Sequence, residues 1–389
     1  MGAGHTAPPA RLGPMKLRWI PARVGDALHE VDTPALVLDL DRFEANLDRL
    51  MKSSTVRGMR VRPHAKSHKC VEIARRQMAA GAVGICCQKV SEAEVFLAGG
   101  IDNVLVSNEI IGKRKVTTLA SLAVRYPKAT IGVCVDDVKQ VRQLATACRA
   151  LAAELEVYIE LDVGHGRAGV PDTAAVVDLA REIKLHKGLK LRGLQAYYGS
   201  AQHRRSVRER RQAITLAAGL AGAARDGLLA EGLTCDIVTG GGTGTFPYET
   251  GSGVYNEVQP GSYVLMDVDY GKNEFDPIAP AFEPALYILS SVMSARGDRV
   301  TLDAGLKAFS TDSGPAMPAF EGWQVRGVSD EHTVLIRVGN EGPNLVLGDK
   351  PLLIPGHIDP TINLHDVIVV SRNDVVIDLW PIEARGAVF

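Results

Sequence analysis

The feature of the sequence that most constrains the fold is an alternation of short apolar runs with longer amphipathic segments between residues 34 and 270. Asp41 can cap a helix in which Phe43, Leu47 and Leu50 recur on one face. Such alternation is typical of βα units around a parallel sheet. The expected strands are Ala35–Leu40, Met59–Pro63, Gly84–Cys87, Asn103–Val106, Thr130–Val135, Glu156–Asp162, Leu191–Ala196 and Asp236–Thr239.

Eight strands of this kind predict an α/β protein with a closed (β/α)8 barrel over residues 34–273. An open doubly wound sheet shows the same alternation, but no Rossmann-type GxGxxG follows the first expected strand. After residue 273 the pattern changes to short β-like runs without a long amphipathic helix. We therefore expect a separate β domain at residues 274–389, which residues 1–33 can also join.

Composition favours a small-molecule partner. The chain holds 44 basic and 45 acidic residues, a net charge of −1, so nothing in it favours nucleic acid or an anionic membrane surface. Its six cysteines form no CxxC pair, and a chain of this size needs no disulfides, so we expect reduced thiols. No segment has the apolar stretch of a signal peptide or a membrane span. We expect a soluble, cytoplasmic protein.

A basic cluster, RPHAKSHK at residues 62–69, follows the second expected strand. In a βα barrel the C-terminal ends of the strands face the active site. A lysine held there among apolar residues and other cations would have a lowered pKa and could form a Schiff base, which makes Lys66 the candidate. A solvated basic turn before a helix is the alternative.

A glycine-rich run, TGGGTGT at residues 239–245, follows the last expected strand. Its backbone N–H groups and threonine hydroxyls suit a phosphate, and phosphate sites recur after strands 7 and 8 of such barrels. The GK[ST] ending of a P-loop is missing. A flexible loop without a ligand is the other interpretation.

A third segment, PGHIDPTINLHD at residues 355–366, holds two metal-ligating side chains two residues apart. In an extended stretch such residues project to the same face, so His357 and Asp359 could jointly hold one divalent cation. Two protein ligands would leave coordination positions open for substrate and water. A hydrogen-bonded turn is the alternative.

Six segments, in the same order, resemble the D-threonine aldolase family, which includes D-3-hydroxyaspartate aldolases and is related to eukaryotic D-serine dehydratases. The similarity runs from about residue 30 to the C-terminus. It implies a pyridoxal phosphate (PLP) barrel of the alanine-racemase type, followed by a β domain that carries a metal site. The segments are DTPALVLDLDRFEANLDRL (32–50), RPHAKSHK (62–69), GICCQKVSEAE (84–94), GGGTGT (240–245), QPGSYVLMD (259–267) and GHIDPTINLHD (356–366).

The resemblance implies roles for individual residues. Lys66 matches the Schiff-base lysine, and His203 matches a histidine proposed as the acid/base group near the substrate hydroxyl. Arg167 is the expected contact to the cofactor oxygen or the substrate carboxylate, and His357 and Asp359 match the metal ligands. The other expected cofactor contacts are Gln88 and Tyr197 near the ring and Thr243, Gly261 and Ser262 at the phosphate.

Three positions depart from related sequences. The family often has GxGRCGV, whereas this chain has Ala168 in place of the cysteine. Tyr198 stands where relatives have His or Gln. Alanine racemases have an arginine that faces the pyridine nitrogen of the cofactor, and the neutral Gln259 stands at the matching position here. The cofactor ring could therefore differ in how it accepts electrons.

The resemblance implies that PLP and a divalent metal (Mn²⁺, Mg²⁺ or Co²⁺) cleave D-threonine or a related D-β-hydroxy amino acid to glycine and an aldehyde. The alternative is a D-serine or D-3-hydroxyaspartate dehydratase, but those enzymes pair the metal histidine with a cysteine, where this chain has the harder ligand Asp359. A racemase needs no metal pair, and PLP-carrier proteins lack the C-terminal β domain. By analogy with fold relatives we expect a homodimer.

Overall fold

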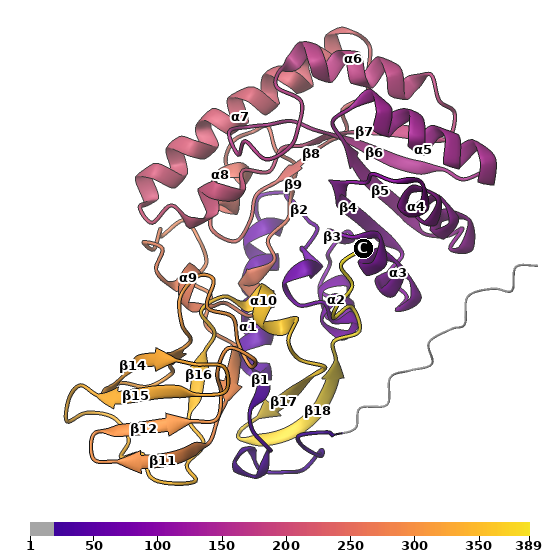
Figure 1. Ribbon diagram of the computed structural model, residues 1–389. Coiled ribbons are helices and arrows are strands. Elements are labelled where there is room, and N and C mark those ends of the chain that lie inside the picture. Colours follow the sequence, from indigo (N-terminus) through magenta and orange to yellow (C-terminus); the bar gives the residue numbers. More distant parts are fainter. Residues whose placement is uncertain (1–18) are drawn as a thin grey trace, which may run out of the picture.

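A closed parallel barrel forms the larger part of the computed structural model, which describes residues 19–389 (Figure 1). Its strands follow the order β2-β9-β8-β7-β6-β5-β4-β3, and a parallel bridge between His64 and Cys86 joins the two ends of the sheet. The predicted α/β barrel is therefore confirmed. The strands are β2 (Arg60–Val61), β3 (Ile85–Cys87), β4 (Asn103–Glu109), β5 (Thr130–Val135), β6 (Leu155–Glu160), β7 (Leu189–Gln195), β8 (Ile237–Gly240) and β9 (Glu257–Val258).

Amphipathic helices surround the barrel, and side-chain caps fix where several of them begin. The Asp172 carboxylate accepts the backbone N–H of Ala175, and the Ser206 hydroxyl accepts that of Glu209, which satisfies donors that a helix start leaves free. The outer helices are α1 (Leu40–Thr55), α2 (Val71–Ala79), α3 (Val90–Ala98), α4 (Lys113–Arg125), α5 (Val138–Leu151), α6 (Thr173–Lys184), α7 (Val207–Ala230) and α8 (Phe246–Thr250).

Helix α7 is long and apolar enough, by length and composition, to cross a membrane. One such helix is weak support for a membrane span, because the core-facing helix of a barrel passes the same test. Its buried face includes Ala213, Ala217, Ala221 and Ala224, and the helix packs against α6 and β7. The composition of α7 is thus explained by packing on the sheet.

The first expected strand is not part of the barrel. β1 (Ala35–Asp39) pairs with β10 (Leu286–Leu289) and, in parallel, with β17 (Val367–Arg372). The eighth barrel strand is instead β9, which has only two residues and which the apolar pattern did not reveal. An apolar run buried on both faces looks the same in any sheet with a parallel neighbour, so the pattern could not distinguish the two sheets.

The C-terminal domain consists of a six-stranded sheet and a four-stranded sheet. The first has the order β13-β16-β10-β1-β17-β18, and the second has the order β11-β12-β15-β14. The prediction that the chain after residue 273 consists mainly of β-strands is therefore confirmed. Its other strands are β11 (Val292–Arg296), β12 (Arg299–Leu302), β13 (Met317–Pro318), β14 (Trp323–Val328), β15 (Thr333–Arg337), β16 (Leu352–Ile354) and β18 (Val375–Pro381).

A shared hydrophobic core joins the two domains. Phe43 and Leu47 of α1 and Val61 of β2 belong to one buried cluster with Ile288 of β10 and Ile358. Ile358 opens α10 (Ile358–Ile362), a short helix that lies between the barrel and the lower sheets in Figure 1. The apolar contact holds the 355–366 segment against the barrel.

The interior of the barrel is layered. Arg62 and Glu257 form a buried ion pair at its N-terminal end, with the guanidinium Nε 2.9 Å from the carboxylate. An apolar middle layer is formed by Cys86, Leu105, Cys134, Tyr158 and Ile237. The polar side chains lie at the opposite end, where the C-terminal ends of the strands form the mouth.

All six cysteines are free, and five of them are buried. Burial raises the pKa of Cys70 to about 12 and that of Cys148 to about 11. The thiolate is the reactive form, so these thiols are inert at neutral pH. The prediction of unpaired cysteines is confirmed.

Substituting Glu257 with alanine tests the ion pair at the barrel floor. The change leaves the Arg62 guanidinium buried and without its counter-charge, so we expect the free energy of unfolding to fall by about 3–5 kcal/mol. Urea unfolding followed by circular dichroism measures it. The control is Glu154→Ala, which breaks an exposed pair with Lys190 and should cost less than about 1 kcal/mol. Equal losses in the two variants would contradict a special role for the buried pair.

Candidate active site

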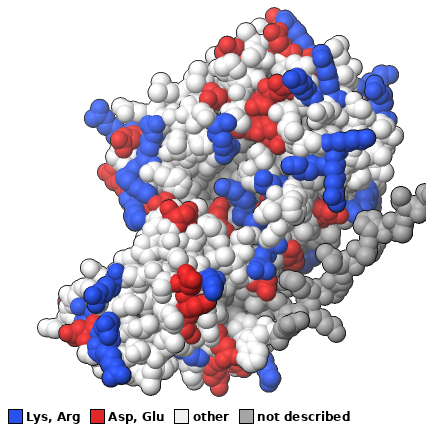
Figure 2. Space-filling model, viewed as in Figure 1, with Lys and Arg blue, Asp and Glu red and all other residues white. Residues whose placement is uncertain are grey.

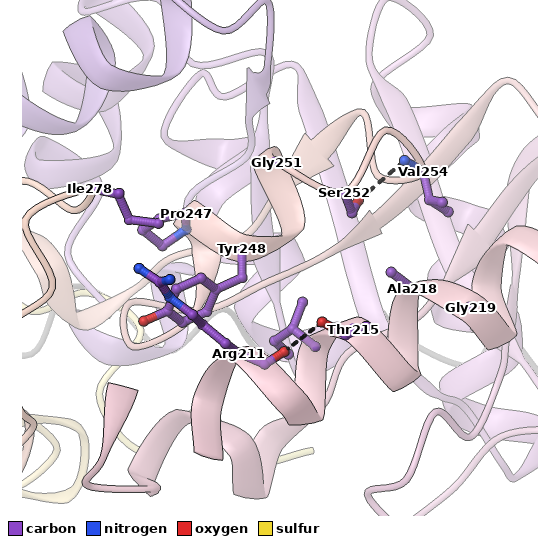
Figure 3. Close-up of a pocket in the computed structure, with 11 residues that line it drawn as sticks. Arg211, Thr215, Ala218, Gly219, Pro247, Tyr248, Gly251, Ser252, Val254 and Ile278 are labelled. Carbon is purple, nitrogen blue, oxygen red and sulfur yellow. Dashed lines mark hydrogen bonds between the residues drawn. The ribbon is translucent and has the colours of Figure 1, made fainter. Parts of the chain in front are cut away.

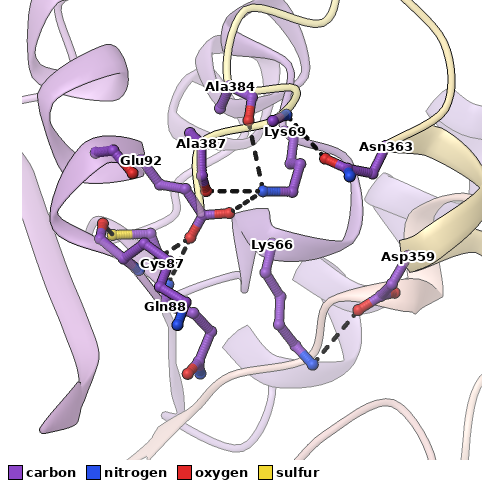
Figure 4. Close-up of polar contacts among 12 residues, drawn as sticks. Lys66, Lys69, Cys87, Gln88, Glu92, Asp359, Asn363, Ala384 and Ala387 are labelled. Atoms are coloured by element: carbon purple, nitrogen blue, oxygen red, sulfur yellow. Dashed lines mark hydrogen bonds and ion pairs between the residues drawn. The ribbon is translucent and has the colours of Figure 1, made fainter. Parts of the chain in front are cut away.

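Lys66 lies at the barrel mouth, in the short turn η2 (Ala65–Ser67) that follows β2. The His64 side chain caps this turn, because its Nδ1 accepts the backbone N–H of Lys66. The Lys66 Nζ is 3.4 Å from an oxygen of Asp359 (Figure 4). The Asp359 carboxylate raises the pKa of Lys66, which reverses the expected lowering, because α10 brings an acid against the amine.

Gln88 contributes to a polar group just inside the mouth. Its amide nitrogen is 3.0 Å from His64 Nε2, and the Ser107 hydroxyl is 3.1 Å from the same nitrogen. Burial, followed by the charge of Lys66, lowers the pKa of His64 well below its usual value. The imidazole is therefore neutral, and the three side chains form an uncharged layer beneath the lysine.

Lys69, the next lysine along the chain, is held away from the mouth (Figure 4). Its Nζ is 2.6 Å from Glu92 and donates to the carbonyls of Ala384 and Ala387 near the C-terminus. Glu92 also accepts the backbone N–H of Gln88. These contacts saturate the Lys69 amine and leave Lys66 as the lysine at the mouth.

The loops expected at the phosphate lie together after β8 and β9. The Thr243 hydroxyl accepts the backbone N–H of Tyr263 at 3.0 Å, which joins the glycine-rich loop to the turn that begins at Ser262. A Cβ at Gly261 would lie 3.0 Å from the carbonyl oxygen of His64, and one at Gly244 would lie 2.4 Å from a backbone oxygen. Only glycine allows this close approach. These two loops follow the seventh and eighth barrel strands, where phosphate sites recur.

Arg167 belongs to a tight loop between β6 and α6. The Asp162 carboxylate accepts the backbone N–H groups of Gly164 and Gly166, at 2.9 and 3.0 Å. The Arg167 guanidinium lies 3.5 Å from Glu160, the last residue of β6. The loop directs this cation toward the mouth.

Tyr197 follows β7 and lies near Lys66. Burial raises the pKa of Tyr197, while the positive charges of Lys66 and Arg167 oppose that rise. The neighbouring Tyr198 accepts a hydrogen bond from Arg204 and packs over Gly164. Tyr197 thus lies near the lysine at the mouth, and Tyr198 contacts the Arg167 loop.

Gln259 is buried and forms hydrogen bonds with neutral groups. Its amide nitrogen donates to the Gln195 side chain at 2.8 Å and to the Thr239 hydroxyl at 2.9 Å. The Gln195 amide donates back to the Gln259 oxygen at 3.1 Å. The mouth therefore has no positive charge at this position.

His357 and Asp359 form a pair beside Lys66. The His357 Nε2 is 3.8 Å from one oxygen of Asp359, and that oxygen is buried without a hydrogen-bond partner among the described residues. The His357 Nδ1 is 2.7 Å from Asp312, an arrangement that commonly orients metal-binding histidines. Asp359 lies in α10, so only His357 has the extended backbone that the sequence suggested. Within residues 19–389, no group of three or more His, Cys, Asp or Glu side chains is placed to hold a metal.

His203 lies at the end of η3 (Gly199–His203), the short turn that follows β7 and Tyr197. Its Nδ1 is 2.5 Å from Asp269 in α9 (Val268–Gly271), and its ring centroid is 5.1 Å from that of Tyr270. Asp269 donates its backbone N–H to the carbonyl of Gly356, which links α9 to the segment of His357. In the part of the chain that the structure describes, no hydrogen bond or ion pair joins His203 to Lys66.

Sequence reasoning missed the two carboxylates that hold these histidines. Asp269 lies 66 residues from His203, and Asp312 lies 45 residues before His357. The segment QPGSYVLMD ends two residues before Asp269, so extending that motif would have included it. Asp312 lies in no motif and could be found only from the fold.

A surface groove of about 570 Å³ lies elsewhere, between α7 and the loop that follows α8 (Figure 3). Arg211, Tyr248 and Val254 are among its lining residues. None of the predicted site residues lines it. The candidate site is the barrel mouth because the chemistry-bearing side chains converge there and not in this groove.

The barrel and its mouth define the alanine-racemase class of PLP enzymes. Residues 38–269 match the family described as alanine racemase, N-terminal domain, and residues 285–371 match the putative serine dehydratase domain. The D-threonine aldolase of an Arthrobacter species is 47% identical over 370 residues, with 94% of this chain and 96% of the relative covered. This chain belongs to the D-threonine aldolase family and is a lyase.

Two further relatives agree with this assignment. The 3-hydroxy-D-aspartate aldolase of Paracoccus denitrificans (strain Pd 1222) is 44% identical over 376 residues, with 94% of this chain and 95% of the relative covered. The crystal structure of D-threonine aldolase from Filomicrobium marinum has a TM-score of 0.91 at 44% identity and covers 95% of this chain and 100% of that one. A dehydratase, the D-threo-3-hydroxyaspartate dehydratase of Delftia sp. HT23, is only 30% identical, with 85% of this chain and 92% of the relative covered.

Replacing Lys66 with alanine should abolish the visible absorbance of bound PLP and turnover together, because Lys69 already donates to Glu92 and two carbonyls. Absorbance spectra after dialysis that removes unbound PLP measure the first effect. As the control, Lys69→Met should lose stability but keep the absorbance of its folded fraction. Retained absorbance in Lys66→Ala would place the cofactor on another lysine.

Proposed function

We propose that this protein is a PLP- and divalent-metal-dependent aldolase that cleaves D-threonine or a related D-β-hydroxy amino acid to glycine and an aldehyde. The observation that carries the proposal is the His357–Asp359 pair, which lies directly beside the Lys66 amine. Relatives that are 43–47% identical over nearly the whole chain are named aldolases, whereas the dehydratases are more distant.

The donor set at the pair fits a divalent cation. Asp359 has a buried oxygen to which no group of residues 19–389 donates, and Asp312 holds the opposite nitrogen of His357, so the Nε2 lone pair faces Asp359. An imidazole and a carboxylate suit Mn²⁺, Mg²⁺ or Co²⁺, and we propose Mn²⁺. A bound cation would lower the pKa of a substrate hydroxyl and fix its position.

The mouth also fits PLP. Lys66 would hold the cofactor, Thr243, Gly261 and Ser262 would hold its phosphate, and the ring would lie near Gln88 and Tyr197. PLP, when bound, delocalises the electron pair that remains on Cα after the Cα–Cβ bond breaks.

Arg167 provides the positive charge at the mouth. Its guanidinium fits the substrate carboxylate or the oxygen of the cofactor ring, because arginine recognises planar anions through paired N–H donors. That contact would orient the substrate before the Cα–Cβ bond breaks.

His203 is proposed to take the proton from the β-hydroxyl. Asp269 accepts the Nδ1–H, which fixes the ring and leaves the Nε2 lone pair free as the base. Tyr270 packs against the same ring and lies near Tyr197, so the histidine is connected to the mouth through two aromatic side chains.

We further propose that the protein is a cytoplasmic homodimer. The Lys66 side chain is 42% exposed in the single chain, and a second copy over the mouth would exclude water from it. Lysine, arginine, aspartate and glutamate are interspersed on the face shown in Figure 2, which supports a small-molecule partner and not a nucleic acid.

Incubation with D-threonine tests the reaction. We expect glycine and acetaldehyde, loss of activity after chelation, and recovery with Mn²⁺, because a two-ligand site is shallow and exchangeable. Chelation should leave the protein folded and the PLP absorbance unchanged. Formation of 2-oxobutanoate would identify a dehydratase, and formation of an epimer would identify a racemase.

Asp359→Asn refines the same test, because it keeps the shape of the side chain and removes the charge of the ligand. Metal affinity should fall while the PLP absorbance persists. Asp366→Asn, which breaks a surface pair with Arg385, is the control and should keep full affinity. Full activity in Asp359→Asn or in the chelated enzyme would disprove the metal assignment.

His203→Ala should lower kcat by about 10²- to 10⁴-fold, the usual contribution of a general base, without changing metal or PLP content. Steady-state kinetics with metal analysis measures both. His186→Ala removes a histidine paired with Glu182 on the surface and should behave like the wild type. An unchanged kcat in His203→Ala would assign the proton transfer to another group, such as a metal-bound hydroxide or His64.

A further inference from the structure

Two neighbouring carboxyl groups, of which Glu160 is buried and Glu109 half-buried, take no part in the proposed chemistry. Glu160 ends β6, and its side chain is only 5% exposed. Glu109 ends β4, with its carboxyl within hydrogen-bonding reach of Glu160. One oxygen of each is buried and has no other side chain or backbone group as a donor among residues 19–389. Two carboxylates cannot donate to each other, so the contact requires that one of them carries a proton.

The charges around the pair favour that shared proton. Burial, and after it the negative charge of Glu109, raises the pKa of Glu160 to about 8. The other groups that face Glu160 are Arg167, whose cation opposes the rise, Asp136, which adds to it, and the neutral thiol of Cys134. Burial and the neighbouring acid therefore favour a proton on one of the two carboxyl groups.

Glu160 is the acidic partner of Arg167. The guanidinium lies 3.5 Å from the Glu160 carboxyl, and 48% of the arginine side chain is exposed. The backbone of its loop is fixed independently, because Asp162 binds Gly164 and Gly166, and Asp136 accepts the N–H of Gly169 at 2.9 Å. The loop thus fixes the arginine Cα, and the direction of the long side chain depends on Glu160.

We propose that Glu160 is a positioning residue that aims the Arg167 guanidinium at the substrate carboxylate, and that Glu109 holds Glu160 in place through a shared proton. The proposal rests on the proposed role of Arg167. It also gives the site a dependence on pH. When the shared proton leaves, the pair gains a second negative charge and draws the guanidinium toward itself and away from the substrate.

The test uses D-alanine, which carries the α-carboxylate and lacks the β-hydroxyl, with its Kd measured from the absorbance of the PLP-loaded enzyme. Glu160→Gln should raise the Kd about tenfold at pH 7. In the Arg167→Gln background the same change should add nothing, because residues that act as one unit are not additive. A merely structural effect of Glu160 would instead add to that of Arg167.

Glu109→Gln provides a second variant and a pH readout. The wild-type Kd should rise as the pH increases through about 8, the pKa raised at Glu160, and Glu109→Gln should remove that rise because only one acid remains. Its Kd at pH 7 should stay within a few-fold of the wild type. The matched control is Glu156→Gln, on the same strand but paired with Arg192, which should leave both readouts unchanged.

Three results would overturn the proposal: an unchanged Kd in Glu160→Gln, additive effects in the double variant, or an alkaline rise that survives in Glu109→Gln. Binding of D-alanine involves no cleavage of a carbon–carbon bond. A failure of the aldolase proposal would therefore appear as missing products with these binding effects intact.

Discussion

The contact between Lys66 and Asp359 is the constraint on which the site depends. The lysine follows the first strand of the barrel, and the aspartate lies in α10 of the C-terminal domain, so their separation of 3.4 Å exists only because both domains are folded together. The apolar cluster that includes Phe43, Val61 and Ile358 maintains that geometry. A fusion of two independent domains would not place a carboxylate at the barrel mouth with this accuracy, since interfaces between such domains are usually mobile.

The layering of the barrel interior separates stability from chemistry. The Arg62–Glu257 pair and the apolar layer above it fill the floor and the middle, so the mouth rests on a packed base. Above that base the side chains are polar, and His64 is neutral because it is buried beneath Lys66. Buried polar groups are costly unless they are satisfied, and the bonds of Gln259 with Gln195 show how this layer satisfies them without a charge.

The sequence allowed prediction of the features that are local in the chain. The βα alternation indicated the barrel, and the motifs around Lys66, Thr243 and His357 lie at the mouth as expected. The prediction failed where the place of a strand depends on pairing with residues that are far away in the sequence. β1 has the apolar character of a barrel strand yet pairs with β17, and β9 is too short to produce a pattern.

The partners of the functional basic side chains follow the same rule. Each predicted lysine, arginine or histidine at the mouth is held by a carboxyl group, and three of those four acids lie outside the predicted site. The pairs are Lys66 with Asp359, Arg167 with Glu160, His203 with Asp269 and His357 with Asp312. A motif reveals the residue that performs the chemistry because its neighbours in the chain fix its backbone, whereas the acid that orients it needs only to be close in space. These acids therefore become visible only in the folded chain, and they set the directions in which the basic side chains point.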